Sequence, residues 1–394
     1  MSIIPEKFIP VNYQQCKVSV MDNISDNNIQ FDKSGICNYY HDYLNFINNN
    51  VLDADSKEQK FNQIIDQIKS KGKGKKYDCL IGLSGGADSS YIAYLAKLNN
   101  LRPLVVHFDY GWNTDAAISN IENIINKLGF ELYTYVIDWK IIRDLQRSYY
   151  KSSVVDLDVP ADHTIFGAIF HIANKFGIKT ILSGSNYQTE FVMPPKWNYL
   201  KTDLKNIQNI HSKFGDLPFK NIHTNGIYDQ LYYWIKGIRA IPLLYYVDYN
   251  QEKVYDLLKK DLDWKDYGAK HFENVFTRFY QGYVLPNKFG IDKRKAHLSN
   301  LIFSGQLNKD EALNILSMPP YDPKLQREDK EYIAKKLGFT IEEFDSLLMQ
   351  DNIEHIFYGS DYRTRKNIYN FASFFLTKKF KKILFSKLLN GRHE

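Results

Sequence analysis

A short apolar run followed by two adjacent glycines constrains the fold of this chain more than any other feature. Residues 78–83 read DCLIGL, and an apolar run of this length between turn residues is typical of a strand buried on both faces. From Ile92 to Leu98 the apolar residues recur at helical spacing. The sequence therefore predicts a strand, a glycine turn, and a helix whose first turn contains Asp88 and Ser89.

The turn is suited to binding phosphate. Adjacent glycines let the backbone approach a ligand, and the free N–H groups at a helix start point toward an anion. Residues 84–89 lack the lysine of a Walker A loop and do not fit G-x-G-x-x-G, which excludes both motifs. A turn containing SGG can also occur by chance. Our interpretation is that this turn binds the phosphates of a nucleotide, through Ser84, Gly85, Gly86, Asp88 and Ser89.

Strands and helices alternate after this turn. Apolar runs predict strands over residues 102–109, 131–137 and 179–183, and helical spacing predicts helices over residues 114–129 and 162–176. This alternation predicts an α/β fold with a doubly wound, mainly parallel sheet. The strands are expected to stop near residue 200. An irregular N-terminal segment precedes the sheet, and a helical C-terminal region follows it, with helices over residues 331–337, 341–348 and 365–389.

Polar residues stand where the predicted strands end. His107 and Asp109 end the second strand, Gly184 follows the fourth, and Glu190 comes shortly after. Ligands of parallel sheets bind at the carboxyl ends of the strands, so His107, Asp109 and Gly184 are predicted to lie near the nucleotide. His107 also suits a core position, and Glu190 a solvated loop. Carboxylates are the ligands that Mg²⁺ prefers, so Asp88 and Glu190 are predicted to hold Mg²⁺.

A second dense patch of charged residues lies between residues 266 and 297. Gly268 and Gly290 break its helical regularity, which favours loops directed at a ligand over a solvated helix face. Its cations could neutralise the phosphates of a substrate and of a departing pyrophosphate. The residues predicted to contact substrate are Tyr267, Lys270, His271, Arg278, Lys288, Lys293 and Arg294. Lys270 and Arg294, together with Asp88, are the predicted catalytic residues.

Length and composition limit the remaining possibilities. A chain of 394 residues predicts more than one domain. We expect an N-terminal segment over residues 1–75 that includes a helix over residues 57–70, a nucleotide-binding α/β domain over 76–250 and a substrate-binding, helical region over 251–394. The net charge of +6 is spread along the chain, which suits an anionic substrate and does not indicate nucleic acid. No apolar run approaches the ~18 residues that a membrane span needs, so none is expected.

The three cysteines indicate a reducing compartment, and we expect a cytoplasmic protein. Cys16 and Cys37 resemble half of a zinc ribbon. A structural zinc site needs four ligands, and only His41 is available as a third. The sequence therefore favours two reduced cysteines over a zinc site.

The SGGADS turn resembles the pyrophosphate loop of the N-type ATP pyrophosphatases, which implies cleavage of ATP to AMP and pyrophosphate in a HUP-like fold. The chain also resembles the N-acetyl sugar amidotransferases of bacterial surface-polysaccharide (lipopolysaccharide) biosynthesis. The second resemblance spans residues 13–320. It runs through FDKSGICNYYHDY, LIGLSGGADSSY, HFDYGWN, ILSGSNYQTE and, most specifically, residues 264–306. Members of that family usually carry two cysteine pairs, whereas Ser19 and Tyr40 occupy two of those places here, which argues further against zinc.

This resemblance implies an ATP- and Mg²⁺-dependent amidotransferase that converts an acetamido group of a sugar into an acetamidino group. The amide oxygen would be adenylated with release of pyrophosphate, and ammonia would then displace AMP. The sugar would be free, lipid-linked or nucleotide-linked. Cys79 lies in the buried strand, and no N-terminal cysteine follows Met1, so a separate glutaminase is expected to supply the ammonia.

Two other interpretations of the same loop remain. A tRNA-thiolating ATP pyrophosphatase would be favoured by cysteine pairs for sulfur transfer, of which the chain has none. A non-catalytic nucleotide-binding or scaffold protein is suggested by the incomplete cysteine pairs, yet the residues of the turn are all present.

Overall fold

The computed structural model describes residues 4–268, 270 and 272–373. The chain forms two compact units. The first comprises the described residues of Met1–Val136, Ala173–Pro194 and Ile238–Ile333, and the second those of Ile137–Ile172, Pro195–Gly237 and Ala334–Glu394. The domain boundaries expected after residues 75 and 250 stay a prediction. No helix in the described part of the chain is long and apolar enough to span a membrane.

The first unit contains a five-stranded sheet with the order β3-β2-β1-β4-β5. Every neighbouring pair is parallel. The strands are β1 (Cys79–Gly82), β2 (Pro103–Asp109), β3 (Glu131–Val136), β4 (Thr180–Ser183) and β5 (Arg239–Pro242). The predicted parallel α/β fold is therefore confirmed.

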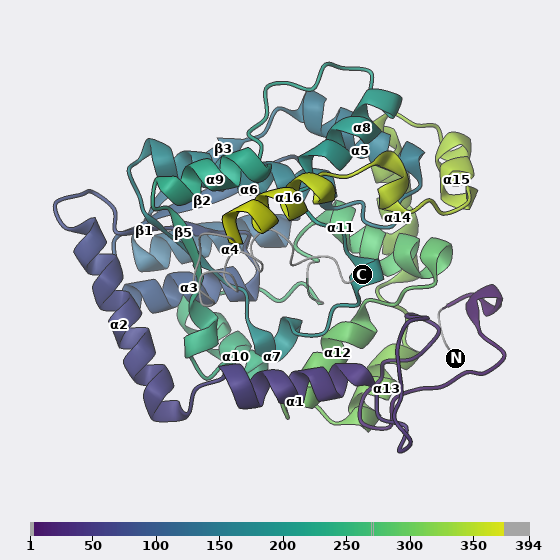
Figure 1. The fold of residues 1–394 in the computed structure, drawn as a ribbon, viewed down its shortest axis with the longest axis horizontal. Coiled ribbons are helices and arrows are strands. Elements are labelled where there is room, and N and C mark those ends of the chain that lie inside the picture. Colours follow the sequence, from purple (N-terminus) through teal and green to yellow (C-terminus); the bar gives the residue numbers. More distant parts are fainter. Residues whose placement is uncertain (1–3, 269, 271, 374–394) are drawn as a thin grey trace. The chain divides into compact units, whose positions relative to one another are not determined.

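Both faces of the central strands are buried. Cys79 and Ile81 pack into a core with Val105 and with apolar residues of the helices α3 (Ala87–Leu98), α4 (Asp115–Leu128) and α10 (Gln251–Leu262). Leu80, whose side chain points to the opposite face, is fully buried as well. Helix α3 packs against α4 and α10 (Figure 1). Burial on two faces explains why the strands are continuous apolar runs instead of alternating ones.

Helix α4 illustrates how local sequence sets the element ends. The Thr114 side chain accepts a hydrogen bond from the backbone N–H of Ala117 and so caps the start of the helix. Gly129 ends the helix in the left-handed conformation, at φ +67°, which costs glycine little. Both ends lie where the sequence predicted them.

The remaining elements of the first unit surround the sheet or follow it. They are η1 (Glu6–Phe8), α1 (Asn38–Asn50), α2 (Ala54–Gly72), α7 (Tyr187–Glu190), η3 (Leu243–Tyr246), α11 (Val275–Phe279), the π-helical η4 (Tyr280–Phe289), α12 (Arg294–Phe303), α13 (Lys309–Ser317) and most of α14 (Pro323–Leu337).

Two expectations for this unit are wrong. The N-terminal segment is not wholly irregular, because residues 38–50 form helix α1. Asparagine is a weak helix former, and the helix is stabilised instead by aromatic contacts of Tyr43 and Phe46 with Phe191. Strands also do not stop near residue 200, since β5 pairs with β4 at the sheet edge. Four residues ending in proline give too short a pattern to reveal such a strand.

The second unit is helical. It comprises α5 (Trp139–Ser152), α6 (Val159–Lys175) up to Ile172, η2 (Pro195–Trp197), α8 (Leu204–Phe214), α9 (Ile227–Ile235), α15 (Ile341–Met349), η5 (His355–Tyr358) and α16 (Tyr362–Ser373). Asp144 of α5 accepts a hydrogen bond from His211 of α8 at 2.7 Å, and this buried contact ties the two helices together. The predicted final helix is confirmed up to Ser373, and its remainder lies outside the described residues.

Candidate functional site

The order of the strands fixes where a ligand can bind. From β1 the chain continues to β2 and β3 on one side of the sheet, whereas β4 and β5 lie on the other side of β1. The loops after β1 and β4 therefore diverge at a switch point, which is where open parallel sheets form a binding crevice. A Cβ atom added to Gly184 after β4 would lie 3.1 Å from the Cβ of Asp88, so the loop after β4 lies against the first turn of the helix that follows β1.

The turn after β1 has the conformation that its glycines allow. Gly85 has φ +82°, and a Cβ atom there would lie 2.6 Å from the carbonyl oxygen of Ala117. Its own carbonyl oxygen accepts hydrogen bonds from the Trp264 indole at 2.9 Å and the Asn120 amide at 3.2 Å. The turn is thus fixed from behind, with the first turn of α3 in front of it.

The serines of the turn bond to one another. The Ser84 backbone N–H donates to Ser89 Oγ at 3.3 Å, and the Gly86 N–H donates to Ser84 Oγ at 3.2 Å. The structure therefore brings the predicted phosphate-binding residues into one compact nest at the start of α3.

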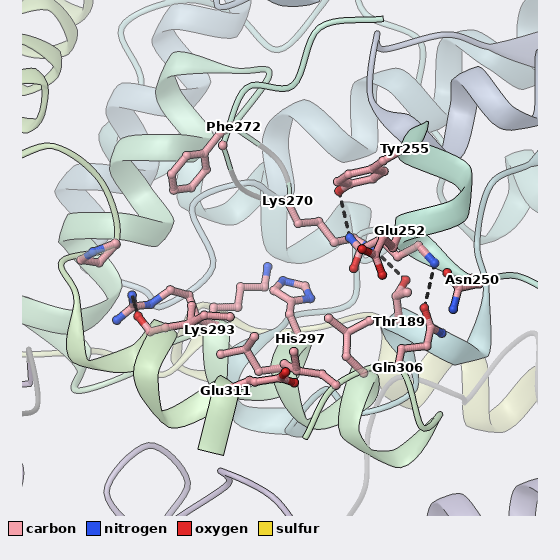
Figure 2. Close-up of a pocket in the computed structure, with 18 of the residues that line it drawn as sticks. Thr189, Asn250, Glu252, Tyr255, Lys270, Phe272, Lys293, His297, Gln306 and Glu311 are labelled. Atoms are coloured by element: carbon pink, nitrogen blue, oxygen red, sulfur yellow. Dashed lines mark hydrogen bonds between the residues drawn. The ribbon is translucent and has the colours of Figure 1, made fainter. Parts of the chain in front are cut away.

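A cavity of about 660 Å³ lies in the same unit. Its size is in the range of small-molecule sites. Figure 2 shows Lys270, Thr189, Lys293 and His297 along its wall, together with Tyr255 and Phe272. Burial, and then the positive charges of Lys270 and Lys293, hold the pKa of His297 well below its usual range, so this imidazole is neutral at pH 7.

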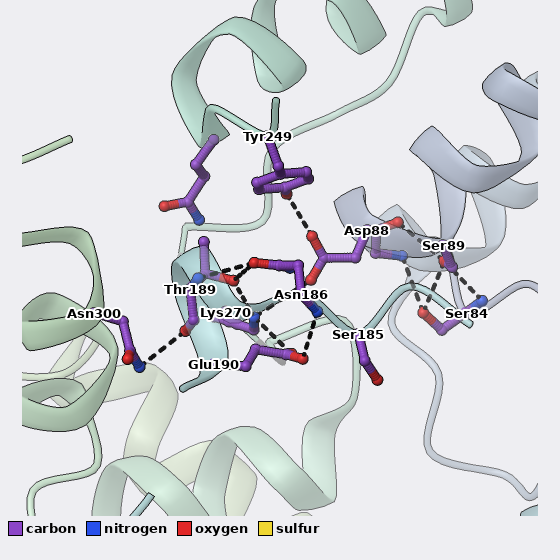
Figure 3. A network of polar contacts seen from close by, with 12 residues as sticks. Ser84, Asp88, Ser89, Ser185, Asn186, Thr189, Glu190, Tyr249, Lys270 and Asn300 are labelled. Carbon is purple, nitrogen blue, oxygen red and sulfur yellow. Dashed lines mark hydrogen bonds and ion pairs between the residues drawn. The ribbon is translucent and has the colours of Figure 1, made fainter. Parts of the chain in front are cut away.

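Lys270 connects this cavity to the phosphate-binding turn. Its Nζ atom lies 2.8 Å from Glu190 Oε1 and 3.3 Å from Asp88 Oδ2, and it donates to Thr189 Oγ1 at 3.1 Å (Figure 3). Burial disfavours the charge, but Asp88 and then Glu190 outweigh it, so the pKa of Lys270 is raised. The lysine is therefore cationic.

Tyr249 completes this network by donating a hydrogen bond to Asp88 Oδ1. The Glu190 carboxylate in turn accepts from the Asn186 N–H at 3.4 Å. Asp88 and Glu190, which the sequence predicts to hold Mg²⁺, both lie against the ammonium group of Lys270, and their role as metal ligands stays a prediction. Two carboxylates and the Thr189 hydroxyl form an oxygen donor set of the kind that Mg²⁺ accepts, so these residues fit the metal implied by the sequence.

Of the other predicted residues, Tyr267 lies at the turn after β1, whereas His107 and Asp109 lie at the end of β2. Tyr267 lies at the phosphate-binding turn, because its hydroxyl would be 3.2 Å from a Cβ atom on Gly86. His107 shares a hydrogen bond with the Leu83 carbonyl at 3.2 Å, and Asp109 accepts one from the Gly111 N–H at 2.9 Å. Both lie at the carboxyl end of β2 but are engaged in local structure. Their roles stay predictions.

The predicted cationic residues do not form one cluster, because some of them line the cavity and others do not. Arg278 forms a two-pronged ion pair with Asp329, at 2.7 and 2.8 Å, and neither it nor the buried Lys288 lines the described cavity. Lys293 and Arg294 do line it. His271 falls outside the described residues.

Arg294 has structural partners in addition to its position on the cavity wall. It binds the buried Asp292 through two nitrogens, at 2.8 and 3.1 Å, and donates to the Met318 carbonyl at 2.9 Å. Its predicted catalytic role stays a prediction, and these contacts predict a second role in stability.

We expect Arg294→Ala to lower the free energy of unfolding by about 3 kcal/mol, because the buried Asp292 carboxylate would lose its ion pair. Thermal unfolding followed by circular dichroism would measure this, with the exposed Lys260→Ala on α10 as control. An unchanged melting temperature combined with lost turnover would assign Arg294 to catalysis alone.

Thr189 and Tyr249 are among the members of the network in Figure 3 that sequence reasoning missed. Thr189 directly precedes Glu190, and the polar turn after β4 was a usable signal for it. Tyr249 belongs to an aromatic stretch that reads as core, and no local pattern distinguishes it from its neighbours. Burial and the adjacent Asp88 raise its pKa, so it stays a hydrogen-bond donor at any physiological pH.

The N-terminal cysteines lie together. The Cys37 N–H donates to Cys16 Sγ at 3.3 Å, and Ser19 Oγ lies 3.9 Å from Cys37 Sγ. In the described part of the chain, no three or more His, Cys, Asp or Glu side chains group in a way that could hold a metal ion. Among the described residues, Cys16 and Cys37 are therefore not part of a complete set of zinc ligands.

Comparison with known proteins gives two family matches. Residues 273–373 match the model of the C-terminal domain of LPS biosynthesis protein WbpG-like proteins, and residues 78–188 match that of queuosine biosynthesis protein QueC. Both parts of the resemblance drawn from the sequence are confirmed, because one match contains the phosphate-binding turn and the other contains much of the charged patch.

Individual relatives are more distant. An uncharacterized protein of Methanocaldococcus jannaschii is 23% identical over 270 residues, which are 66% of this chain and 79% of that protein. Among solved structures, NMN synthetase from Francisella tularensis has a TM-score of 0.36 at 16% identity and covers 68% of this chain and 92% of its own. NH3-dependent NAD synthetase from Campylobacter jejuni has a TM-score of 0.30 at 16% identity, with 72% and 97% covered.

Proposed function

We propose that the protein is an ATP-dependent amidotransferase. The premise is that residues 273–373 are similar to the C-terminal domain of WbpG-like LPS biosynthesis proteins, and that residues 78–188 are similar to queuosine biosynthesis protein QueC. Its substrate is an acetamido sugar of a bacterial surface polysaccharide, and its product carries an acetamidino group. The enzyme forms AMP and pyrophosphate. We further propose that it acts in the cytoplasm.

The observation that carries this proposal is the position of Lys270. One ammonium group touches Asp88 of the helix that follows the phosphate-binding turn, and it also lines the cavity. A nucleotide on the turn and a second substrate in the cavity would therefore meet at Lys270. Transfer between two substrates requires this arrangement, since both must be held in reacting distance.

The reaction proceeds in two displacements. The amide oxygen of the acetamido group attacks the α-phosphorus of ATP, the bond to the β-phosphate oxygen breaks, and pyrophosphate leaves. Ammonia then attacks the activated carbon, AMP leaves with the former amide oxygen, and the nitrogen loses a proton. The nest of N–H groups at the start of α3 stabilises the departing pyrophosphate, and Lys270 neutralises charge that develops between the two sites.

Asp88 and Glu190, with Thr189, would hold Mg²⁺, which supplies positive charge to the phosphates when bound. Lys293 and the neutral His297 face the second substrate in the cavity. The sugar is nucleotide-linked, lipid-linked or free, and a separate glutaminase subunit delivers the ammonia. Neither the adenylation nor the displacement of AMP by ammonia requires a covalent nucleophile on this chain.

The test is to incubate the protein with ATP, Mg²⁺, ammonium and a panel of acetamido sugars, and to measure pyrophosphate release and the product mass. We expect a product in which NH replaces one oxygen. Asp88→Ala should abolish sugar-dependent pyrophosphate release, because the shared ammonium of Lys270 loses a partner at the turn. The exposed Asp263→Ala serves as control for loss of a carboxylate.

Retained release in Asp88→Ala would remove that residue from the reaction. If AMP and pyrophosphate formed only with tRNA and a sulfur donor, the tRNA-thiolating alternative would replace our proposal. ATP binding without any turnover would leave a non-catalytic nucleotide-binding protein.

A further inference from the structure

A carboxyl group lies against the phosphate-binding turn, beside the place proposed for the phosphates of ATP. A Cβ atom added to Gly86 would lie 3.2 Å from Glu273 Oε1 and 3.2 Å from the Tyr267 hydroxyl. The same hydroxyl accepts a hydrogen bond from the Ala87 N–H, at the start of α3. Glu273 is therefore next to the N–H groups to which a phosphate would bind.

Glu273 is held firmly in this position. Its backbone carbonyl accepts hydrogen bonds from the Thr114 N–H at 3.0 Å and the Thr114 hydroxyl at 3.1 Å. The residue that follows, Asn274, caps helix α11 through a bond from the Thr277 N–H. These contacts fix the backbone from which the carboxyl group reaches the turn.

The second carboxyl oxygen of Glu273 has no compensating contact. Oε2 is buried and has no hydrogen-bond partner in the described part of the chain. A buried carboxylate in this state is costly, whereas a protonated carboxyl group is not. The protonated form also has an O–H donor, which the ionised form lacks.

The groups around Glu273 shift its titration into the physiological range. Burial is the largest influence and raises the pKa of Glu273 to about 7, and the negative charge of Asp88 acts in the same direction. The residue's own N–H, the positive charge of Lys270 and the bond from Tyr267 act in the opposite direction. Near pH 7 the carboxyl group is thus divided between its two protonation states.

We propose that Glu273 takes up a proton when the phosphates of ATP bind to the turn, and that the protonated carboxyl group donates a hydrogen bond to a phosphate oxygen. The proton comes from solvent, and no other bond forms or breaks. This inference rests on the proposed function, because it assumes that the turn binds ATP. It makes ATP affinity depend on pH through a single side chain.

The direction of the dependence follows from the charges. Bound phosphates add negative charge beside Glu273 and favour its protonated form, so the bound state holds the proton to a higher pH than the free protein does. ATP affinity is then greatest at low pH and falls as the pH rises through about 7, by up to about tenfold per pH unit.

Isothermal titration calorimetry tests this directly. A non-hydrolysable ATP analogue with Mg²⁺ is titrated at about pH 8 in two buffers whose ionisation enthalpies differ, and the difference in heat gives the number of protons taken up. We expect a substantial fraction of a proton for the wild type and none for Glu273→Gln. The exposed Glu122→Gln on α4 should retain the wild-type uptake.

Glu273→Gln should also bind the analogue with an affinity that no longer changes with pH, because the amide is a permanent donor. Equal uptake in wild type and Glu273→Gln, or no uptake in the wild type, would overturn the inference while leaving ATP binding intact. Absence of analogue binding in the wild type would instead refute the proposed function.

A second variant keeps the test decisive if Glu273→Gln does not fold. Tyr267→Phe removes a hydrogen bond that favours the ionised carboxylate, so it should move the proton uptake to higher pH. An unchanged pH profile of proton uptake in Tyr267→Phe would contradict the assignment to Glu273.

Discussion

Replacing Gly85 by alanine is expected to abolish ATP binding. The residue has φ +82°, where a Cβ atom costs about 1–2 kcal/mol, and the added atom would lie 2.6 Å from the Ala117 carbonyl oxygen. Both are backbone constraints, so no side-chain movement relieves them. The turn must shift, and the N–H groups that bind phosphate shift with it. We expect at least about a hundredfold loss of affinity, since two or more charge-assisted hydrogen bonds are lost.

The matched control is Gly74→Ala. Gly74 also has a positive φ, of +76°, but a Cβ atom there meets nothing within 4 Å. It therefore carries the same conformational cost without the collision, outside the turn. Calorimetry of ATP binding and thermal unfolding should be measured for both variants. Wild-type ATP affinity in a folded Gly85→Ala would show that the turn does not bind the phosphates.

The second large effect is expected for Lys270→Met. Methionine preserves much of the side-chain volume and removes the ammonium group, so Asp88 and Glu190 lose the cation that they share. We expect sugar-dependent turnover to fall by a factor on the order of 10²–10³, the usual effect of removing one electrostatic stabiliser of a transition state. Lys270→Arg should recover part of the turnover but not all. The guanidinium group of arginine is planar, and it cannot contact in the same way the three oxygen atoms of Asp88, Thr189 and Glu190 that surround the ammonium group of Lys270.

The control for this prediction is Lys260→Met, which removes an exposed lysine of α10. Turnover and ATP affinity should be measured separately, because Lys270 is assigned to both sides of the reaction. If turnover in Lys270→Met stayed within a factor of about two of the wild type, the ammonium group would have only a structural role. The position of Lys270 would then no longer support the proposed function.

The sequence was sufficient for features encoded locally. The turn between β1 and α3 could be predicted because glycines, an apolar run and a helical stripe follow one another within a few residues. Helix α1 could not, because its stability comes from aromatic contacts of Tyr43 and Phe46 with residues far along the chain. Local propensity was overridden by tertiary packing.

The site illustrates the same limit. Lys270 was identified as a candidate from the charge density of its segment, but its contact with Asp88 joins residues 182 positions apart. Counting cations also treated Arg278 and Lys270 as equivalent, although Arg278 is bound to Asp329. Charge can be read from a sequence, whereas the partner of each charge depends on the fold. Glu273 belongs in this group, since only its position at the turn gives it a role.

The division of the chain between its two units has a consequence for synthesis and truncation. The backbone passes from one unit to the other five times, after residues 136, 172, 194, 237 and 333. The sheet is therefore incomplete until β5 has emerged from the ribosome, and the last helix of the first unit comes later still. No single cut releases either unit as a continuous piece. A truncation that ends between residues 137 and 333 removes parts of both units, so the order in which the chain leaves the ribosome, not a boundary between modules, sets when the candidate site can form.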